Sequence, residues 1–231
     1  MSNFGYGKAQ EAQYAKNLRK IAKDIDLLCK QYSDAKDLQF ALESYAQTLD
    51  PVAEKYAQKM ISDASKRNLA AWIATGKAAG KDFSVLVKNS STAVQVATHL
   101  GAQVDMIKTL PLNSAKKAQQ LAIDAVAGSL RAEDIVGELL KIGSQSYYEA
   151  TRVARTEIAK TNAAITQSRA REVGVDAYIW RCVSDSNSRE SHLEMDGELC
   201  NFYNPPIVDG EPLNPGEIYN CRCFADPVIT S

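Results

Sequence analysis

The sequence lacks a long hydrophobic run and has no strong excess of charge of either sign. None of its 231 residues lies in a stretch approaching the roughly 18 consecutive apolar residues that a membrane-spanning helix needs, and residues 1–20 contain no apolar signal-peptide core. We therefore expect no membrane contact and a cytoplasmic place of synthesis. Lysine plus arginine (27) nearly balance aspartate plus glutamate (28), so no whole-chain field attracts nucleic acid.

Histidine and cysteine are also scarce. The chain has two histidines, no glycine-rich phosphate loop and no second cluster of carboxylates that would indicate a catalytic metal pair. Five cysteines, an odd number without a signal peptide, argue against a secreted disulfide framework. Four of them lie in the last quarter of the chain, at Cys182, Cys200, Cys221 and Cys223. This uneven distribution needs a local cause.

Most of the chain has the composition and the periodicity of helices. From about 8 to 171 good helix formers dominate, and apolar residues recur at helical spacing. Residues 33–49 predict one helix with Ser33 as its N-cap, and Asp50-Pro51 marks the start of the next helix, which runs to about Thr75. Pro111 is expected to break the helical stretch that follows.

Two further helices are predicted, over about 132–142 and 145–172, with Gly174 ending the second. After residue 176 the pattern becomes alternating and β-prone, followed by a short polar helix and a loop rich in Pro, Gly and Asn. The fold class is therefore mainly α with a small C-terminal α+β domain. A helical N-terminal arm or bundle covers 1–130, and a second domain covers 131–231. Its compact unit, 177–228, buries little apolar surface by itself, so we expect it to dock on the 145–172 helix, bind a metal, or both.

The segment 184–200 contains a candidate metal-binding histidine. Ser184 or Asp185 is expected to cap a helix that ends at Gly197, and this helix would place Arg189, His192 and Asp196 on one face. Asp196, four residues after His192, would accept the imidazole proton and orient the ring toward a metal.

Two cysteines lie one residue apart near residue 222. In an extended segment Cys221 and Cys223 project to the same side. With His192 and a fourth thiolate, Cys200 in preference to Cys182, they would complete a tetrahedral structural zinc site. The alternative is that the cysteines pack as small hydrophobic residues and His192 makes an ordinary hydrogen bond. The spacing is not the usual C-x2-C, and both interpretations stay open.

A set of short motifs over about 147–227 is the most specific signal in the chain. It consists of Arg155-Thr156-Glu157 with Asn162 on the long helix, Trp180, Asp185-x3-Arg189-x2-His192-x3-Asp196-Gly197, a Pro-Gly loop, and Asn220-Cys221-Arg222-Cys223. In this order and spacing the set resembles the phage head morphogenesis family, the minor head proteins similar to those of phages Mu and SPP1.

The resemblance implies a structural role in the virion. A few copies would associate with the portal protein at one vertex, take part in head assembly with other head proteins in the host cytoplasm, and end inside the head. It implies no enzyme activity and no small-molecule substrate.

Other functions remain as alternatives. Asp185, Arg189, His192 and Asp196 could form a hydrolase or nuclease centre with His192 as general base. The protein could instead be a delivery module that is ejected with the genome, or its basic residues could contact DNA non-specifically.

Overall fold

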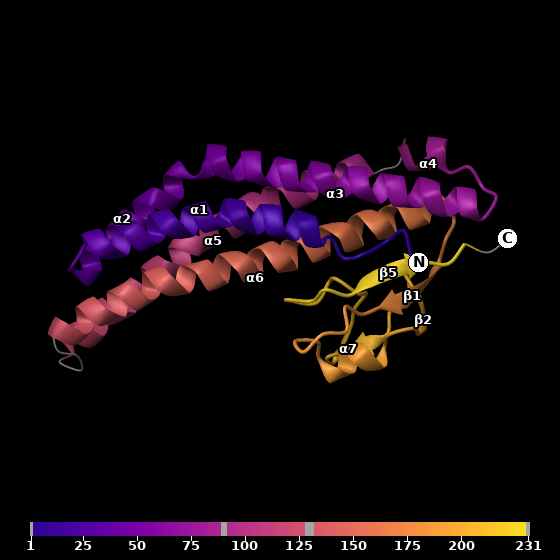
Figure 1. The fold of residues 1–231 in the computed structure, drawn as a ribbon. Coiled ribbons are helices and arrows are strands. Elements are labelled where there is room, and N and C mark those ends of the chain that lie inside the picture. The colour runs from indigo at the N-terminus through magenta and orange to yellow at the C-terminus, as the bar shows by residue number, and fades with distance from the viewer. Residues whose placement is uncertain (1, 89–91, 128–131, 230–231) are drawn as a thin grey trace. The chain divides into compact units, whose positions relative to one another are not determined.

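The computed structural model describes residues 2–88, 92–127 and 132–229, which are mostly helical with a small antiparallel sheet (Figure 1). The fold class predicted from the sequence is confirmed. Among the described residues, no helix combines the length and the hydrophobicity needed to cross a bilayer. The predicted domain boundary between 130 and 131 lies outside the described residues. The helices are α1 (Lys8–Gln31), α2 (Ala35–Thr48), α3 (Asp50–Ala78), α4 (Ser84–Lys88), α5 (Thr92–Val126), α6 (Ala132–Glu172) and α7 (Glu190–Glu194).

The chain forms two compact units, and each contains segments that are far apart in the sequence. Unit 1 comprises Met1–Glu11, Lys59–Leu100 and Arg155–Ser231. Unit 2 comprises Ala12–Gln58 and Gly101–Ala154.

Unit 2 is a helical bundle. Its core consists of aliphatic side chains on the buried stripes of its helices, such as Leu18 and Leu42, which are both fully buried. Polar contacts join neighbouring helices: the Ser146 hydroxyl of α6 donates to the Ala22 carbonyl of α1 at 3.1 Å. Lys117 of α5 forms an ion pair with Glu149 of α6 at 2.7 Å. Within this unit the helices are therefore packed side by side.

The predicted break between two helices near residue 143 is wrong, because α6 runs without interruption from Ala132 to Glu172. Gly143 lies where α1 approaches most closely. A methyl group at this position would lie 3.0 Å from the Cα atom of Asp26 and 3.3 Å from the Cβ atom of Cys29. The glycine therefore permits a close contact between two helices and does not end one.

Other helix boundaries also differ from the prediction. Pro111 lies inside α5, where the neighbouring Leu110 is almost fully buried, so packing outweighs the cost of about 3 kcal/mol that proline imposes on a helix interior. Asp34, not Ser33, caps α2, and its carboxylate accepts hydrogen bonds from the backbone N–H groups of Lys36 and Asp37. The helix expected to stop at Thr75 continues to Ala78. Gly174, with φ 68°, follows the end of α6 as predicted.

In unit 1 a buried arginine joins α3 to α6. Arg169 Nη1 donates to the Ser65 carbonyl at 2.9 Å and to Asn68 Oδ1 at 2.8 Å. Asn68 in turn donates to Thr166 Oγ1 at 2.7 Å. Burial lowers the pKa of Arg169 to about 10, which leaves it charged at neutral pH. This polar contact fixes the register of the two helices.

The sheet of unit 1 is antiparallel, with the strand order β2 (Leu199–Asn201), β1 (Ala177–Arg181), β5 (Phe224–Pro227). Trp180 of β1 lies opposite Ala225 of β5, and Tyr178 lies opposite Cys200 of β2. Phe4 packs edge-on against Trp72 of α3, with ring centroids 5.2 Å apart, so the segment before α1 belongs to this core. The strands are β1 (Ala177–Arg181), β2 (Leu199–Asn201), β3 (Ile207–Val208), β4 (Glu211–Pro212) and β5 (Phe224–Pro227), and β3 and β4 form a separate hairpin.

The compact C-terminal unit, residues 177–228, docks on α6. This was expected because so small a unit buries little apolar surface by itself. The backbone N–H of Asn220 donates to Thr156 Oγ1 at 3.0 Å, and Gln167 donates to the Phe202 carbonyl at 3.2 Å. Gly216, at φ 92°, approaches α6 so closely that a methyl group there would lie 3.0 Å from the Ala159 carbonyl oxygen. Only glycine satisfies both the positive φ and this close approach.

Candidate metal centre

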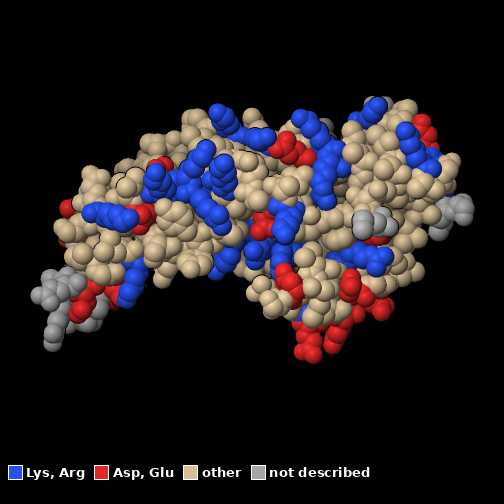
Figure 2. All heavy atoms as spheres, viewed as in Figure 1, with Lys and Arg blue, Asp and Glu red and all other residues tan. Residues whose placement is uncertain are grey.

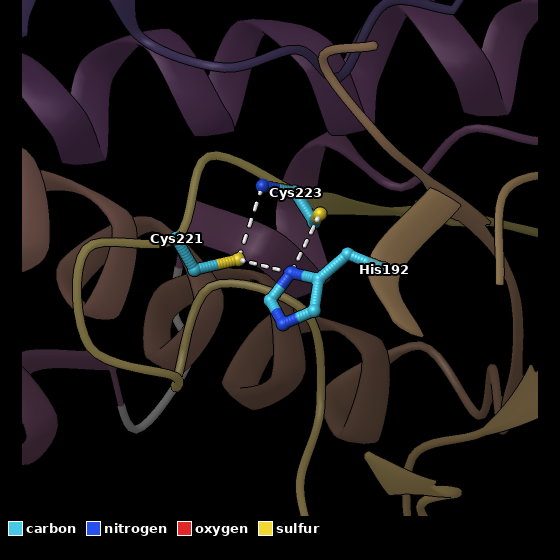
Figure 3. A group of neighbouring side chains, drawn as sticks. All are labelled: His192, Cys221 and Cys223. Carbon is cyan, nitrogen blue, oxygen red and sulfur yellow. Dashed lines mark hydrogen bonds between the residues drawn. The ribbon is translucent and has the colours of Figure 1, made fainter. Parts of the chain in front are cut away.

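Three side chains from two separate segments of unit 1 converge in its interior (Figure 3). His192, Cys221 and Cys223 are each at most 4% exposed. The Nδ1 atom of His192 lies 3.6 Å from Cys221 Sγ and 3.5 Å from Cys223 Sγ. The backbone N–H of Cys223 donates to Cys221 Sγ at 3.2 Å, which holds the two residues in a tight turn.

These distances fit a tetrahedral metal site. With zinc–nitrogen bonds of about 2.0–2.1 Å and zinc–sulfur bonds of about 2.3 Å, tetrahedral geometry separates nitrogen from sulfur by about 3.5 Å. The two observed separations agree with this value. The group could therefore hold a metal ion, and its nitrogen and sulfur donors are the types that zinc prefers.

His192 reaches the group from a short helix. Because α7 covers only Glu190–Glu194 and has no side-chain N-cap, the longer helix predicted from Ser184 or Asp185 to Gly197 is wrong. Asp185 instead accepts a hydrogen bond from the Asn187 backbone in the preceding turn. The ring of His192 packs edge-on against Trp180, with centroids 6.0 Å apart, so β1 fixes its position.

The carboxylate partner of His192 is Asp209, not the predicted Asp196. Asp209 Oδ2 lies 3.2 Å from His192 Nε2 and accepts a hydrogen bond of 2.8 Å from Arg189 Nη1. Ser191 donates to its other oxygen at 2.7 Å. Since α7 ends at Glu194, Asp196 is outside the helix and cannot lie one turn beyond His192 on the same face. It accepts the backbone N–H of Cys182 at 2.8 Å instead.

Asp209 was missed because its only sequence signal is that of a turn. Asp209-Gly210 joins β3 to β4, and Asp209 has a φ of 54°. This pattern predicts a hairpin, but it does not predict that the hairpin faces His192.

The electrostatics of the group favour a cation. The hydrogen bond with Cys223, helped by His192, lowers the pKa of the Cys221 thiol and so favours its thiolate form. The contact with Cys221 raises the pKa of His192; Asp209 acts in the same direction and burial opposes both. Ser191 first, with His192 and Arg189, keeps the pKa of Asp209 low. Cysteine sulfur on one side of the ring and a carboxylate on the other match a metal-bound histidine with an outer carboxylate.

The motif on α6 meets the motif around the cysteines. Arg155 Nη1 donates to Asn220 Oδ1 at 3.2 Å, while Thr156 accepts the Asn220 backbone N–H. Asn220 has a φ of 57°, a left-handed conformation that asparagine tolerates. The next residue but one, Arg222, forms a bidentate ion pair with Asp185. These contacts hold the residue before Cys221 and the residue between the two cysteines.

Comparison with known proteins agrees with this combination of motifs. Residues 116–225 match the family model described as "Phage Mu protein F like protein". They form a Phage Mu F-like domain. The chain is also 32% identical over 203 residues to an "Uncharacterized protein" of Haemophilus influenzae, an alignment that covers 86% of this chain and 44% of that protein. The chain thus spans less than half the length of this relative. No solved structure matches the chain.

The remaining predicted residues of the Phage Mu F-like domain lie apart from the metal-binding group. Glu157 is buried in α6, and Asn162 donates to the Ile158 carbonyl of the same helix at 3.0 Å. Gly197, with φ 94°, turns the chain so that its N–H donates to the Trp180 carbonyl at 2.9 Å. Cys200 lies on β2 opposite Tyr178, and the structure does not bring it to His192, Cys221 and Cys223.

Proposed function

We propose that this chain is a structural minor head protein of a phage, associated with the portal vertex and involved in head assembly. The match of residues 116–225 to the Phage Mu F-like family is the observation that carries this proposal. Its partners are then the portal protein and other head proteins. Its location is the virion, inside the head, after assembly in the host cytoplasm.

The contacts of the polar residues support a structural role over a catalytic one. A hydrolase would need His192 free to take a proton from water, with its carboxylate partner beside the substrate. Here one ring nitrogen faces two sulfur atoms, and the other faces Asp209. Asp185 is bound by Arg222, and Asp196 is bound by a backbone N–H, so the four residues of the hydrolase alternative are not gathered around one cavity.

The charge distribution favours protein partners over DNA for the C-terminal part of unit 1. Figure 2 shows acidic side chains gathered on the visible face of this part, whereas Lys and Arg are spread over the helices among acidic residues. The exposed acidic residues near α7 include Glu194, Asp196 and Glu198. Such a face repels the phosphate backbone.

We further propose that the bound metal is a structural zinc ion, held by His192, Cys221 and Cys223 with Asp209 orienting the ring. When bound, zinc would join α7 to the turn that precedes β5 and would add its binding energy to folding. The metal content of the purified protein tests this: we expect one equivalent of zinc, removed by strong chelators. A protein that refolds with native stability in metal-free buffer would contradict it.

The proposed role in the phage head is tested by measuring the copy number of this chain in particles. Quantitative mass spectrometry of purified particles should find this chain at a low copy number that follows the portal protein and not the major capsid protein. Co-expression with its own portal protein should yield a complex, and a chain lacking residues 177–231 is the comparison. Absence from particles, with the chain free in the cytoplasm, would overturn the structural role.

A further inference from the structure

Three ligands leave one position of a tetrahedral site to be filled. In structural zinc sites all four ligands come from the protein, whereas catalytic sites keep one position for water. We propose that Cys182 is the fourth ligand, which makes the site a closed centre of one histidine and three cysteines. This inference rests on the structural zinc proposed above.

The register of the sheet places Cys182 beside Cys223. In the antiparallel pair of β1 and β5, Trp180 lies opposite Ala225 and Arg181 lies opposite Phe224. Continuing this register by one residue brings Cys182 opposite Cys223. Residues directly opposite in an antiparallel pair have Cβ atoms about 4.5–5.5 Å apart. This separation allows both thiolates to bind one metal ion.

The side chain of Cys182 also lies on the required face of β1. Successive side chains of a strand alternate between its faces, so Cys182 follows Tyr178 and Trp180 on the buried face. Trp180 is the residue whose ring packs against His192. Cys182 lines the same small cavity as the three ligands. It is also among the groups that raise the pKa of the Cys223 thiol, after Cys221 and burial.

Asp196 gains a role from this arrangement. Its carboxylate accepts the backbone N–H of Cys182 at 2.8 Å, just beyond the last residue of β1. This hydrogen bond holds the end of the strand in place, so Asp196 is a positioning residue for the fourth ligand and not for His192.

The same register excludes Cys200. Cys200 lies opposite Tyr178, four residues before Cys182 along β1. At a rise of about 3.3 Å per residue, this places it about 13 Å along the strand from Cys182. Cys200 is therefore a matched control, since both cysteines are half-buried, with Cys182 just after β1 and Cys200 within β2.

Cobalt substitution tests the inference directly, because the thiolate-to-cobalt charge-transfer band grows with the number of thiolate ligands. The full chain is loaded with Co²⁺ and then titrated with Zn²⁺. We expect Cys182→Ser to lose about one third of the band, one of three thiolates, and to weaken zinc binding by at least about 100-fold, more than the loss of an outer-shell partner costs. Cys200→Ser should retain the full band and the full affinity.

A second variant keeps the test decisive if Cys182→Ser does not fold. Cys182→His restores a ligand atom, so we expect a tetrahedral cobalt spectrum with a two-thiolate band and recovered affinity. A band in either variant at position 182 that equals the wild-type band would overturn the assignment of Cys182 and leave the structural zinc intact. A wild-type chain that takes up neither Co²⁺ nor Zn²⁺ would overturn the zinc proposal, and the assignment of Cys182 with it. The copy number in particles does not depend on either result.

Discussion

The bundle of unit 2 and the C-terminal segment from Ala177 to Pro227 are stabilised by different kinds of contact. In the bundle, aliphatic side chains repeat along each helix, and many of them, such as Leu18, Ile21 and Leu42, are fully buried. The C-terminal segment has strands of two to five residues, and its interior includes a histidine and two cysteines. Its turns are fixed by single polar contacts, such as the ion pair of Asp185 with Arg222.

This difference determines how the stability of each region responds to a substitution or to removal of metal. In the bundle the stabilising free energy is spread over many similar contacts, so one substitution removes a fraction of it. In the C-terminal segment His192, Cys221 and Cys223 are buried together, and a metal ion would connect the separate stretches of chain that carry them. Removing metal should therefore affect the C-terminal segment while leaving the bundle unchanged, and substituting a core leucine should do the opposite.

Metal removal should have the largest effect. We expect chelation to destabilise the C-terminal segment by about 4 kcal/mol or more, the linkage energy of a ligand present at about 1,000 times its dissociation constant. Hydrogen exchange would show this as lost protection of amides in β1 and β5, with α1 and α2 unchanged. Cys221→Ser should abolish the response to chelator, whereas Cys29→Ser, at a buried cysteine of the bundle, should keep it. Equal loss of protection in both regions would contradict the comparison.

Leu42→Ala should have the next largest effect and should act on the bundle. Leu42 is fully buried, so we expect a loss of about 3 kcal/mol in the free energy of unfolding of unit 2, independent of metal. Leu27→Ala is the matched control, because Leu27 is 52% exposed and should change stability by only about 0.5 kcal/mol. Denaturation of each variant, monitored by hydrogen exchange, measures the two effects on unit 2. A metal-dependent effect of Leu42→Ala would show that the regions unfold as one.

Two glycines of α6 should respond in opposite directions. Gly143→Ala should destabilise the bundle by about 1–3 kcal/mol, because the added methyl group meets the backbone of Asp26. Gly137→Ala should stabilise it by about 0.5–1 kcal/mol, because this glycine is exposed to open space in the same helix. Denaturation midpoints of the two variants test this, and a stabilising Gly143→Ala would disprove the close contact of α1 with α6.

The smallest effects are expected where the turn before β5 meets α6. Thr156→Val leaves the partly buried N–H of Asn220 without its acceptor and should cost about 1–2 kcal/mol. Asn220→Gly keeps the left-handed backbone and loses only the contact with Arg155, so it should cost less than about 1 kcal/mol. Both effects should appear as faster hydrogen exchange in β5. If Asn220→Gly lowered the stability more than Thr156→Val, the contact of Asn220 with Arg155 would be the more important of the two, contrary to this prediction.

The helices could be predicted from the sequence, and their boundaries only in part. Periodic apolar residues identified them because a stripe at helical spacing must be buried. The break predicted between residues 142 and 145 was wrong because α6 continues through Gly143. Glycine serves both to end helices and to let them approach closely, and sequence does not separate these uses. Pro111 was misread for a related reason, since packing around it outweighs its local cost.

The residues of the candidate site could likewise be predicted from the sequence only in part. The sequence alone determined which residue types can bind metal, His192 with Cys221 and Cys223, because nitrogen and sulfur ligands are rare and their chemistry is specific. The tertiary structure decided that Asp209, and not Asp196, lies beside the ring of His192. It also supplied the strand register from which we infer Cys182, and not Cys200, as the fourth ligand. The physical reason is that contacts between strands and turns depend on register, and a shift of a few residues moves a side chain by more than 10 Å. The spacing of residues along the sequence does not contain the register of the strands. Only the folded sheet shows which residues lie opposite one another.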